Sequence, residues 1–331
     1  MIELKGINKT FRVAKRNPGF GEAVKALFKK EYTYIKALRD VSFTIGEGEM
    51  VGYIGPNGAG KSSTVKIMSG ILTPDSGECV INGRVPWKER RRHAAEIGVV
   101  FGQRSQLWWD VPVIDSFELL RDIYRIREAD YKANLDRLTE LLGLGELLRT
   151  PARQLSLGQR MRCEFAASLL HDPKILFLDE PTIGLDAVSK LAVRDFIRAL
   201  NRERGTTVIL TTHDMQDIEA LTERIILIGG GRILLDGSLA GLRERHSAVR
   251  TLTVTYSGGE DVTGVKVDGL TLSESESRPG RAVFTLDTER LPVSAAISLI
   301  SEKCEIRDIS VSGESIDETV VSLYREFGIG V

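Results

Sequence analysis

GPNGAGKS, residues 55–62, carries the most specific structural signal in this 331-residue chain. It matches a glycine-rich pattern ending in Gly-Lys-Ser, and it lies between the apolar run 50–54, which predicts a buried strand, and a helical pattern over 61–72. Glycines let successive backbone N–H groups approach phosphate oxygens, and the helix adds the positive end of its dipole. Lys61 is placed as a point charge for the terminal phosphates, and the Ser62 hydroxyl suits Mg²⁺. We therefore predict that this loop binds a nucleoside triphosphate with Mg²⁺.

Polar residues follow two further apolar runs. Asp179 and Glu180 end the run 175–178, and His213 ends the run 208–212. Since the carboxyl ends of parallel strands line the crevice where α/β sheets hold ligands, we expect all three side chains at the nucleotide. Asp179 would reach Mg²⁺, Glu180 would polarise the water that attacks the γ-phosphate, and His213 would contact that phosphate. The plainer interpretation is two solvated acids and a structural histidine.

Strands alternate with helices through most of the chain, which predicts a mostly parallel α/β sheet. Helical periodicity from 113 to 148, and again after Ser156, indicates an inserted helical subdomain at about 104–170. After residue 244 short strands and helices mix, which predicts a small α+β domain. We therefore predict a nucleotide-binding domain at 1–240 and an accessory domain at 244–331.

The charge distribution supports that division. Lys plus Arg (45) nearly equals Asp plus Glu (46), so no net charge draws the whole chain onto nucleic acid. From Glu244 onward, however, there are 9 basic and 15 acidic residues, a net of −6, which leaves +5 for the remainder of a chain whose total is −1. The three cysteines are scattered, as expected for reduced thiols, and Cys163 lies in an apolar run typical of a core.

A basic segment, residues 12–36, separates the first two predicted strands (2–11 and 37–45). It holds seven basic and two acidic residues. An apolar stripe of helical spacing, Phe20, Val24, Leu27 and Phe28, predicts an amphipathic helix within it. This helix would touch lipid headgroups or a partner helix, or else pack on its own domain as a surface excursion.

Further motifs occur in a fixed order around the phosphate loop. Gln103 follows the strand pattern 96–101, the stretch LSLGQR spans 155–160, and GLD spans 184–186. With the strand that ends in Asp179 and with His213, this ordered set resembles the ATP-binding cassette (ABC) family over about residues 1–240. The resemblance implies a P-loop NTPase core with an inserted helical subdomain, and ATP as the nucleotide.

The resemblance also implies a role for each matching residue. The triphosphate would be held by Gly55, Pro56, Asn57, Gly58, Ala59, Gly60, Lys61, Ser62 and Ser63. Mg²⁺ would be bound by Ser62, Gln103 and Asp179. Gln103 would also contact the attacking water, Glu180 would be the general base, and His213 would hold the γ-phosphate.

The same resemblance implies a head-to-tail dimer around two ATP. Ser156, Gly158 and Gln159 would cap the γ-phosphate bound by a second copy, and Asp186 would couple the two sites. The three capping residues belong to the stretch LSLGQ, residues 155–159, which we call the signature. Leu157 stands where the commonest form of the signature has Gly. Phe11 would stack on adenine, although Tyr32 or Tyr34 is an alternative because the basic segment follows directly.

The sequence also suggests what ATP drives. The N-terminus is charged and no apolar run reaches the roughly 18–20 residues of a membrane span, so we expect a separate membrane permease and a location at the cytoplasmic face of the membrane. Trp108 and Trp109 would contact that permease, or simply pack within the helical subdomain. The insertion and the QLWWD stretch (106–110) resemble exporter ATPases of the daunorubicin-resistance type.

The sequence allows alternative roles for the accessory domain and for the chain as a whole. The accessory domain would mediate dimer contacts or regulation, or else bind cargo. The main alternative function is a soluble ABC ATPase acting on nucleic acid or ribosomes. The single cassette and the balanced charge argue against it, so no nucleic acid partner is expected. A P-loop kinase or GTPase is disfavoured because the chain lacks a guanine-specifying NKxD between strands.

Overall fold

A computed structural model describes residues 1–14, 32–102, 104–245, 249–259, 265, 267–273, 277–313 and 316–328. It divides into two compact units, Met1–Gly237 (unit 1) and Ser238–Val331 (unit 2). The division lies a few residues before the boundary expected from composition.

The centre of unit 1 is a six-stranded sheet in the order β5-β6-β7-β3-β8-β9. The strands are β3 (Met50–Ile54), β5 (Ile97–Phe101), β6 (Ile175–Asp179), β7 (Thr207–Thr211), β8 (Arg224–Gly229) and β9 (Arg232–Ser238). The pairs β5–β6, β6–β7, β7–β3 and β3–β8 are all parallel. These inner strands are apolar and buried along most of their length, as parallel strands covered on both faces must be. The predicted parallel α/β sheet is confirmed.

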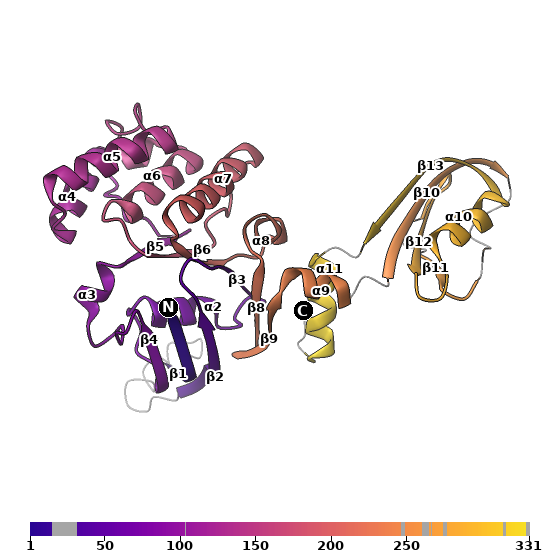
Figure 1. The fold of residues 1–331 in the computed structure, drawn as a ribbon, viewed down its shortest axis with the longest axis horizontal. Helices are drawn as coiled ribbons and strands as arrows, with labels where there is room; N and C mark the ends of the chain where they lie inside the picture. The colour runs from indigo at the N-terminus through magenta and orange to yellow at the C-terminus, as the bar shows by residue number, and fades with distance from the viewer. Residues whose placement is uncertain are drawn as a thin grey trace, which may run out of the picture. The chain divides into compact units, whose positions relative to one another are not determined.

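A second, three-stranded antiparallel sheet has the order β2-β1-β4. Its strands are β1 (Ile2–Ala14), β2 (Tyr32–Ile45) and β4 (Ser76–Ile81). Helix α2 (Lys61–Met68) contacts β2 and β4 on one side and β6 on the other. Figure 1 shows α2 between the two sheets, where one continuous apolar core includes Ile2, Val65, Phe177 and Ile226.

Most remaining helices of unit 1 lie on the opposite face of the large sheet from α2 (Figure 1). They are α4 (Val113–Tyr124), α5 (Glu128–Leu142), α6 (Leu157–Leu169) and α7 (Ala187–Arg204), with α3 (Arg90–Ala94), α8 (Met215–Leu221) and a 3-10 turn at Ala152–Gln154 completing the unit. Helix α6 packs on α4, α5 and β5. Its buried side includes Cys163 and Phe165, which anchors the helical region to the sheet.

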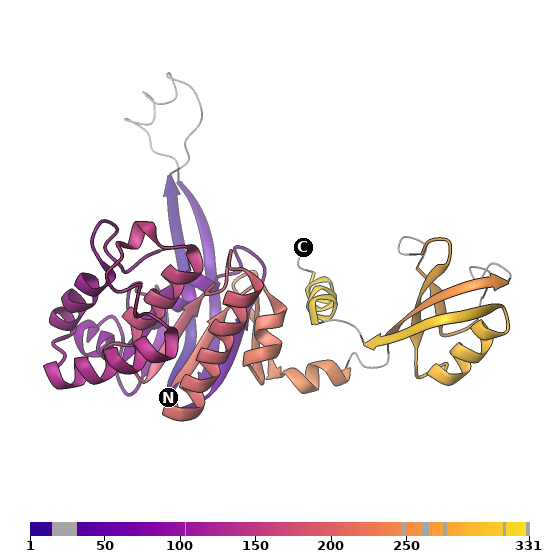
Figure 2. The same cartoon turned by 90° about the horizontal axis from the view of Figure 1, so that it is seen from above.

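The expected insertion is shorter than the sequence suggested. Strand β1 runs on to Ala14 and β2 begins at Tyr32, with Phe11 opposite Ile35 and Ala14 opposite Tyr32. Figure 2 shows the two strands projecting from unit 1 as a ribbon. Residues 12–14 and 32–36 are thus paired strand, because β-branched and aromatic side chains continue the ladder on both sides. The predicted amphipathic helix at 20–28 falls outside the described residues.

Unit 2 contains a four-stranded antiparallel sheet in the order β11-β12-β10-β13. The strands are β10 (Val249–Gly259), β11 (Leu270–Leu272), β12 (Arg281–Asp287) and β13 (Cys304–Gly313), and the helices are α9 (Leu239–Arg245), α10 (Val293–Ser301) and α11 (Ile316–Glu326). Helix α10 packs its Ala296 and Ile300 into a core with Leu252 and Phe284. Over the residues described in both units, no helix has the length and apolar character needed to cross a bilayer.

Candidate nucleotide-binding site

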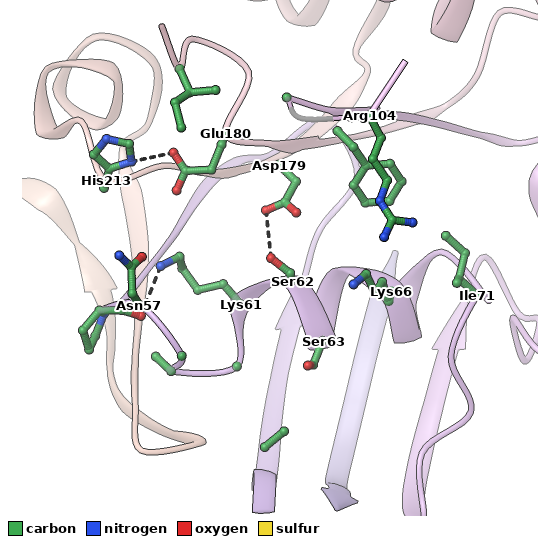
Figure 3. Close-up of a pocket in the computed structure, with 18 residues that line it drawn as sticks. Asn57, Lys61, Ser62, Ser63, Lys66, Ile71, Arg104, Asp179, Glu180 and His213 are labelled. Atoms are coloured by element: carbon green, nitrogen blue, oxygen red, sulfur yellow. Dashed lines mark hydrogen bonds and ion pairs between the residues drawn. The ribbon is translucent and has the colours of Figure 1, made fainter. Parts of the chain in front are cut away.

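A cavity of about 610 Å³ opens between the N-terminus of α2 and the carboxyl ends of β6 and β7. Figure 3 shows its lining, with Glu180 and His213 on one flank of the Ser62–Asp179 pair and Arg104 and Lys66 on the other. The lining residues are Ala37, Pro56, Asn57, Gly58, Ala59, Gly60, Lys61, Ser62, Ser63, Lys66, Ile71, Phe101, Gly102, Arg104, Asp179, Glu180, Ile183 and His213. Gly55 lies just behind this wall, where an added Cβ would collide with the Ile228 carbonyl.

The phosphate loop ends at a helix N-terminus that has no side-chain cap, while inside the loop the Ala59 amide donates to the Pro56 carbonyl oxygen at 3.1 Å. Gly60 caps α2 with a φ of 114°, and no side chain occupies the helix N-terminus. An added Cβ at Gly60 would lie 2.7 Å from the Ala37 carbonyl oxygen, so only glycine fits this position. Unpaired N–H groups at a helix N-terminus, with the helix dipole behind them, form an anion site.

Lys61 lies across the mouth of the loop. Its ammonium donates to the Gly55 carbonyl oxygen at 2.5 Å and to the Pro56 carbonyl oxygen at 3.3 Å. Burial lowers the pKa of Lys61, while the charges of Glu180 and Asp179 oppose that shift. An anionic phosphate in the cavity would stabilise the charged ammonium, as the two carboxylates do. It would also give the ammonium stronger hydrogen-bond acceptors than two carbonyl oxygens.

Two hard oxygen donors converge at the start of α2. The Ser62 hydroxyl lies 3.4 Å from Asp179 Oδ1, which also accepts a hydrogen bond from the Thr211 hydroxyl at 2.5 Å. One hydroxyl and one carboxylate at this spacing fit the oxygen ligands that Mg²⁺ takes beside substrate phosphates. Thr211 was not anticipated from sequence, yet it fixes the rotamer of Asp179.

Glu180 and His213 form a pair at the ends of β6 and β7. The imidazole Nδ1–H donates to Glu180 Oε2 at 2.6 Å, and the Glu180 amide donates to the Thr211 carbonyl oxygen at 2.9 Å. Glu180 has a left-handed backbone with a φ of 56°, which costs about 1–2 kcal/mol for a residue with a side chain. That conformation turns its carboxylate into the cavity (Figure 3).

Not every predicted residue meets the cavity. Gln103 lies outside the described residues, although its neighbours Gly102 and Arg104 both line the wall. Neither Phe11 nor Tyr32 nor Tyr34 belongs to the described lining. Phe11 instead lies near the Lys9 ammonium, 5.9 Å from ring centre to nitrogen, and Arg12 covers the Tyr32 ring at 3.4 Å. Arg104 and Lys66 are lining cations that the motifs did not single out.

The signature residues are also absent from the described lining of this cavity. Ser156 caps α6 and exchanges hydrogen bonds with Gln159, whose amide donates to the serine hydroxyl at 3.2 Å. Asp186 caps α7 and accepts from the Ser189 amide at 2.9 Å. A Cβ on Gly158 would lie 2.6 Å from Ser189 Oγ, so the two helix N-termini adjoin closely. The N-termini of α6 and α7 together form a second polar surface, on which Ser156 is exposed.

Comparison with known proteins decides the family. A family model described as "ABC transporter" matches residues 38–183. The ABC transporter ATP-binding protein NatA of Bacillus subtilis is 32% identical over 66% of this chain and 88% of its own length. The daunorubicin resistance ATP-binding protein DrrA3 of Streptomyces coeruleorubidus is 31% identical over 89% of this chain and 93% of its own length. This chain belongs to the ATP-binding proteins of ABC transporters.

Solved structures agree with that assignment. An ATP-binding cassette in a dimeric, post-hydrolysis state with bound ADP and Pi is similar with a TM-score of 0.60 and 27% identity, covering 72% of this chain and 99% of that one. The P-loop NTPase fold of an ABC ATPase is thereby confirmed, and with it the coupling of ATP hydrolysis to transport. Relatives differ in direction, since a methionine import ATP-binding protein of Bradyrhizobium diazoefficiens is also 28% identical over 100% of this ABC ATPase and 86% of its own length.

Proposed function

We propose that this ABC ATPase hydrolyses MgATP as a head-to-tail pair of identical subunits and drives a separate membrane permease that exports a drug-like, antibiotic or glycan substrate. The observation that carries the proposal is the separation, within one chain, of the phosphate cavity from the signature surface. Each chain then supplies only half of an enclosed nucleotide site.

The chemistry follows from the cavity. The α2 N-terminus and Lys61 bind the β- and γ-phosphates, and Asp179 and Ser62 would hold Mg²⁺, which would supply positive charge beside the transferring phosphoryl group. Glu180 accepts the proton of the attacking water. His213 keeps that carboxylate oriented through the 2.6 Å hydrogen bond, and as an imidazolium it would also donate from its other ring nitrogen to the γ-phosphate. Gln103 assists at the metal and the water.

The second copy completes the site. A serine hydroxyl, a glycine amide and the N-terminal end of α6 offer donors to an anion, and none of these residues belongs to the described lining of the cavity in their own chain. Ser156, Gly158 and Gln159 therefore cap ATP bound by the partner, and Asp186, which caps the adjoining helix, couples the two sites. ATP closes the pair and hydrolysis opens it.

Exposed tryptophans support a permease contact. Trp108 is 44% exposed and Trp109 is 50% exposed, and the adjacent helix α4 leaves Leu119 and Ile123 in solvent. Large exposed apolar side chains beside a polar loop are typical of interface anchors. A permease bound there would hold this ATPase at the cytoplasmic face of the membrane. Export is favoured by the resistance proteins among its relatives. We also propose that unit 2 is an accessory domain, mediating dimer contacts or regulation.

Glu180→Gln tests the proposal. The amide keeps the hydrogen bond with His213 but no longer takes a proton, so we expect ATP to bind while turnover falls by about 100-fold or more. ATP should then convert the chain to a stable dimer, measured by sedimentation velocity with Lys61→Ala as the weak-binding control at the same ATP concentration. Wild-type turnover in Glu180→Gln contradicts the general base, and a monomer in saturating MgATP contradicts the shared site.

A further inference from the structure

A buried carboxylate connects the signature helix to the edge of the nucleotide cavity. Glu164 lies on α6 with 3% of its surface exposed. It accepts a hydrogen bond from the Ser105 hydroxyl, and its Oε2 accepts the Gln106 amide at 2.9 Å. Burial raises the pKa of Glu164, whereas the hydrogen bonds from Ser105, Gln106 and Leu107 act to lower that pKa. A buried carboxylate is costly unless such donors satisfy it, so its partners are held firmly.

The residues that donate to Glu164 belong to a loop that reaches the nucleotide cavity at one end and two exposed tryptophans at the other. Arg104, one residue before Ser105, lines the nucleotide cavity. Trp108 and Trp109, a few residues later, are exposed where we place the permease. The side chain of Gln106 is fixed in turn, because its Nε2 donates to the Val99 carbonyl oxygen of β5 at 2.7 Å. Residues 104–109, the connecting loop, thus join β5, the cavity and an exposed surface.

A second contact ties the same helix to the same loop. Arg160, four residues before Glu164, places its guanidinium 5.7 Å from the centre of the Trp109 ring. Residues four apart lie on one face of a helix. One face of α6 therefore contacts the connecting loop near both of its ends. The backbone adds a third link, since the Arg153 amide donates to the Trp109 carbonyl oxygen at 3.0 Å, two residues before the signature begins.

We propose that Glu164 is a positioning residue that couples the nucleotide cavity of one subunit to the helix capping the nucleotide of its partner. The inference rests on the proposed shared site. Ser156 caps α6 about 12 Å along the helix from Glu164. Because a helix moves as a rigid rod, a displacement of the connecting loop carries Ser156 and Gly158 with it. ATP bound in one cavity, or a permease bound at the tryptophans, would thereby change how closely Ser156 and Gly158 approach the ATP bound by the partner.

The test measures ATP binding and ATP-driven dimerisation separately, in a Glu180→Gln parent. Glu164→Ala removes both acceptors of the loop. We expect its affinity for a fluorescent ATP analogue, measured below the dimerisation concentration, to stay within about twofold of the parent, because the phosphate loop is untouched. The ATP concentration for half-maximal dimer, measured by sedimentation velocity, should rise about fivefold or more.

Glu164→Gln is the rescue. Its carbonyl oxygen can accept the Gln106 amide while its NH₂ donates to Ser105, whose hydroxyl then turns to the Leu107 carbonyl oxygen at 3.3 Å. We expect it to dimerise within about twofold of the parent. Ser168→Ala is the matched control, since Ser168 is buried on the same helix and its hydroxyl donates to the Phe165 carbonyl oxygen within α6. It should leave the dimerisation midpoint unchanged.

The outcomes separate the two claims. A parent that stays monomeric in MgATP overturns the shared site and this inference with it. A parent that dimerises while Glu164→Ala dimerises at the same ATP concentration overturns the inference alone, as do equal shifts in Glu164→Ala and Ser168→Ala. If Glu164→Ala does not fold, Ser105→Ala takes its place, with a smaller shift in the same direction expected and no shift refuting the coupling.

Discussion

Arg194 and Asp217 form an ion pair inside unit 1 that joins the two strand ends carrying Glu180 and His213. Asp217 is fully buried, its Oδ1 accepts a hydrogen bond from Arg194 Nε at 2.6 Å, and the same oxygen forms an ion pair with Arg194 Nη2 at 2.6 Å. The hydroxyls of Thr182, two residues after Glu180, and of Thr212, directly before His213, donate to the same carboxylate. Arg194→Ala leaves this carboxylate in the core without a counter-charge.

The expected loss is large for a single substitution. Removing one partner of a buried ion pair costs about 3–5 kcal/mol, because the remaining charge is uncompensated. Since two threonine hydroxyls still donate to Asp217, we expect the lower end, about 3 kcal/mol. For a unit of this size, each kcal/mol shifts the melting temperature by about 2–4 °C, which gives a drop of roughly 6–12 °C.

Calorimetry at neutral pH measures the shift. Arg202→Ala is the matched control, because Arg202 lies exposed on the same helix α7. Surface substitutions stay within about 0.5 kcal/mol, so its melting temperature should move by less than about 2 °C. Equal melting temperatures for the two variants would refute the reasoning, since Asp217 would then need no guanidinium.

Three further predictions concern the cavity, the buried histidine and the exposed tryptophans. Lys61→Ala should weaken ATP binding by about 10- to 100-fold, because hydrogen bonds to charged groups contribute about 1.5–3 kcal/mol; unchanged affinity in equilibrium dialysis would contradict the phosphate-loop assignment. Burial lowers the pKa of His93, so as the pH falls below the unfolded-state value near 6.5 the unfolded chain takes up a proton that the folded chain does not. The free energy of unfolding should therefore decrease from about pH 7 toward pH 5, and His93→Gln, whose amide can still donate to the Met68 carbonyl oxygen, should show a shallower decrease in denaturant titrations; an identical slope would exclude His93 as the cause. Trp108→Ser, which leaves the contact between Arg160 and Trp109 in place, should keep the ATPase rate of the isolated chain within about twofold but abolish co-purification of the permease from native membranes, whereas retained permease would place that contact elsewhere.

The parts of the site that follow from sequence are those set by local chain geometry. The phosphate loop needs its glycines wherever it occurs, so residues 55–62 predict the loop, the strand before it and the helix after it. Asp179 and His213 were located in the same way, since Asp179 is the last residue of the apolar strand β6 and His213 follows the apolar strand β7 by two residues. Parallel pairing then brings those strand ends to one edge.

The parts that sequence did not predict depend on contacts between distant segments. Glu164 and Ser105 are 59 residues apart, and nothing in either motif shows that a loop after β5 packs on α6. Thr211 lies inside an apolar run, and only the adjacency of β6 and β7 brings its hydroxyl to Asp179. The strand ends at Ala14 and Tyr32 were missed because the basic composition of 12–36 masked the alternation that continues the ladder.

A structure of Glu180→Gln with MgATP tests the shared site most directly. It should contain two copies, with Ser156 Oγ and the Gly158 amide of each within hydrogen-bond distance of the γ-phosphate held by Lys61 of the other. A triphosphate bound by Lys61 with no serine from a second copy near it would contradict the account.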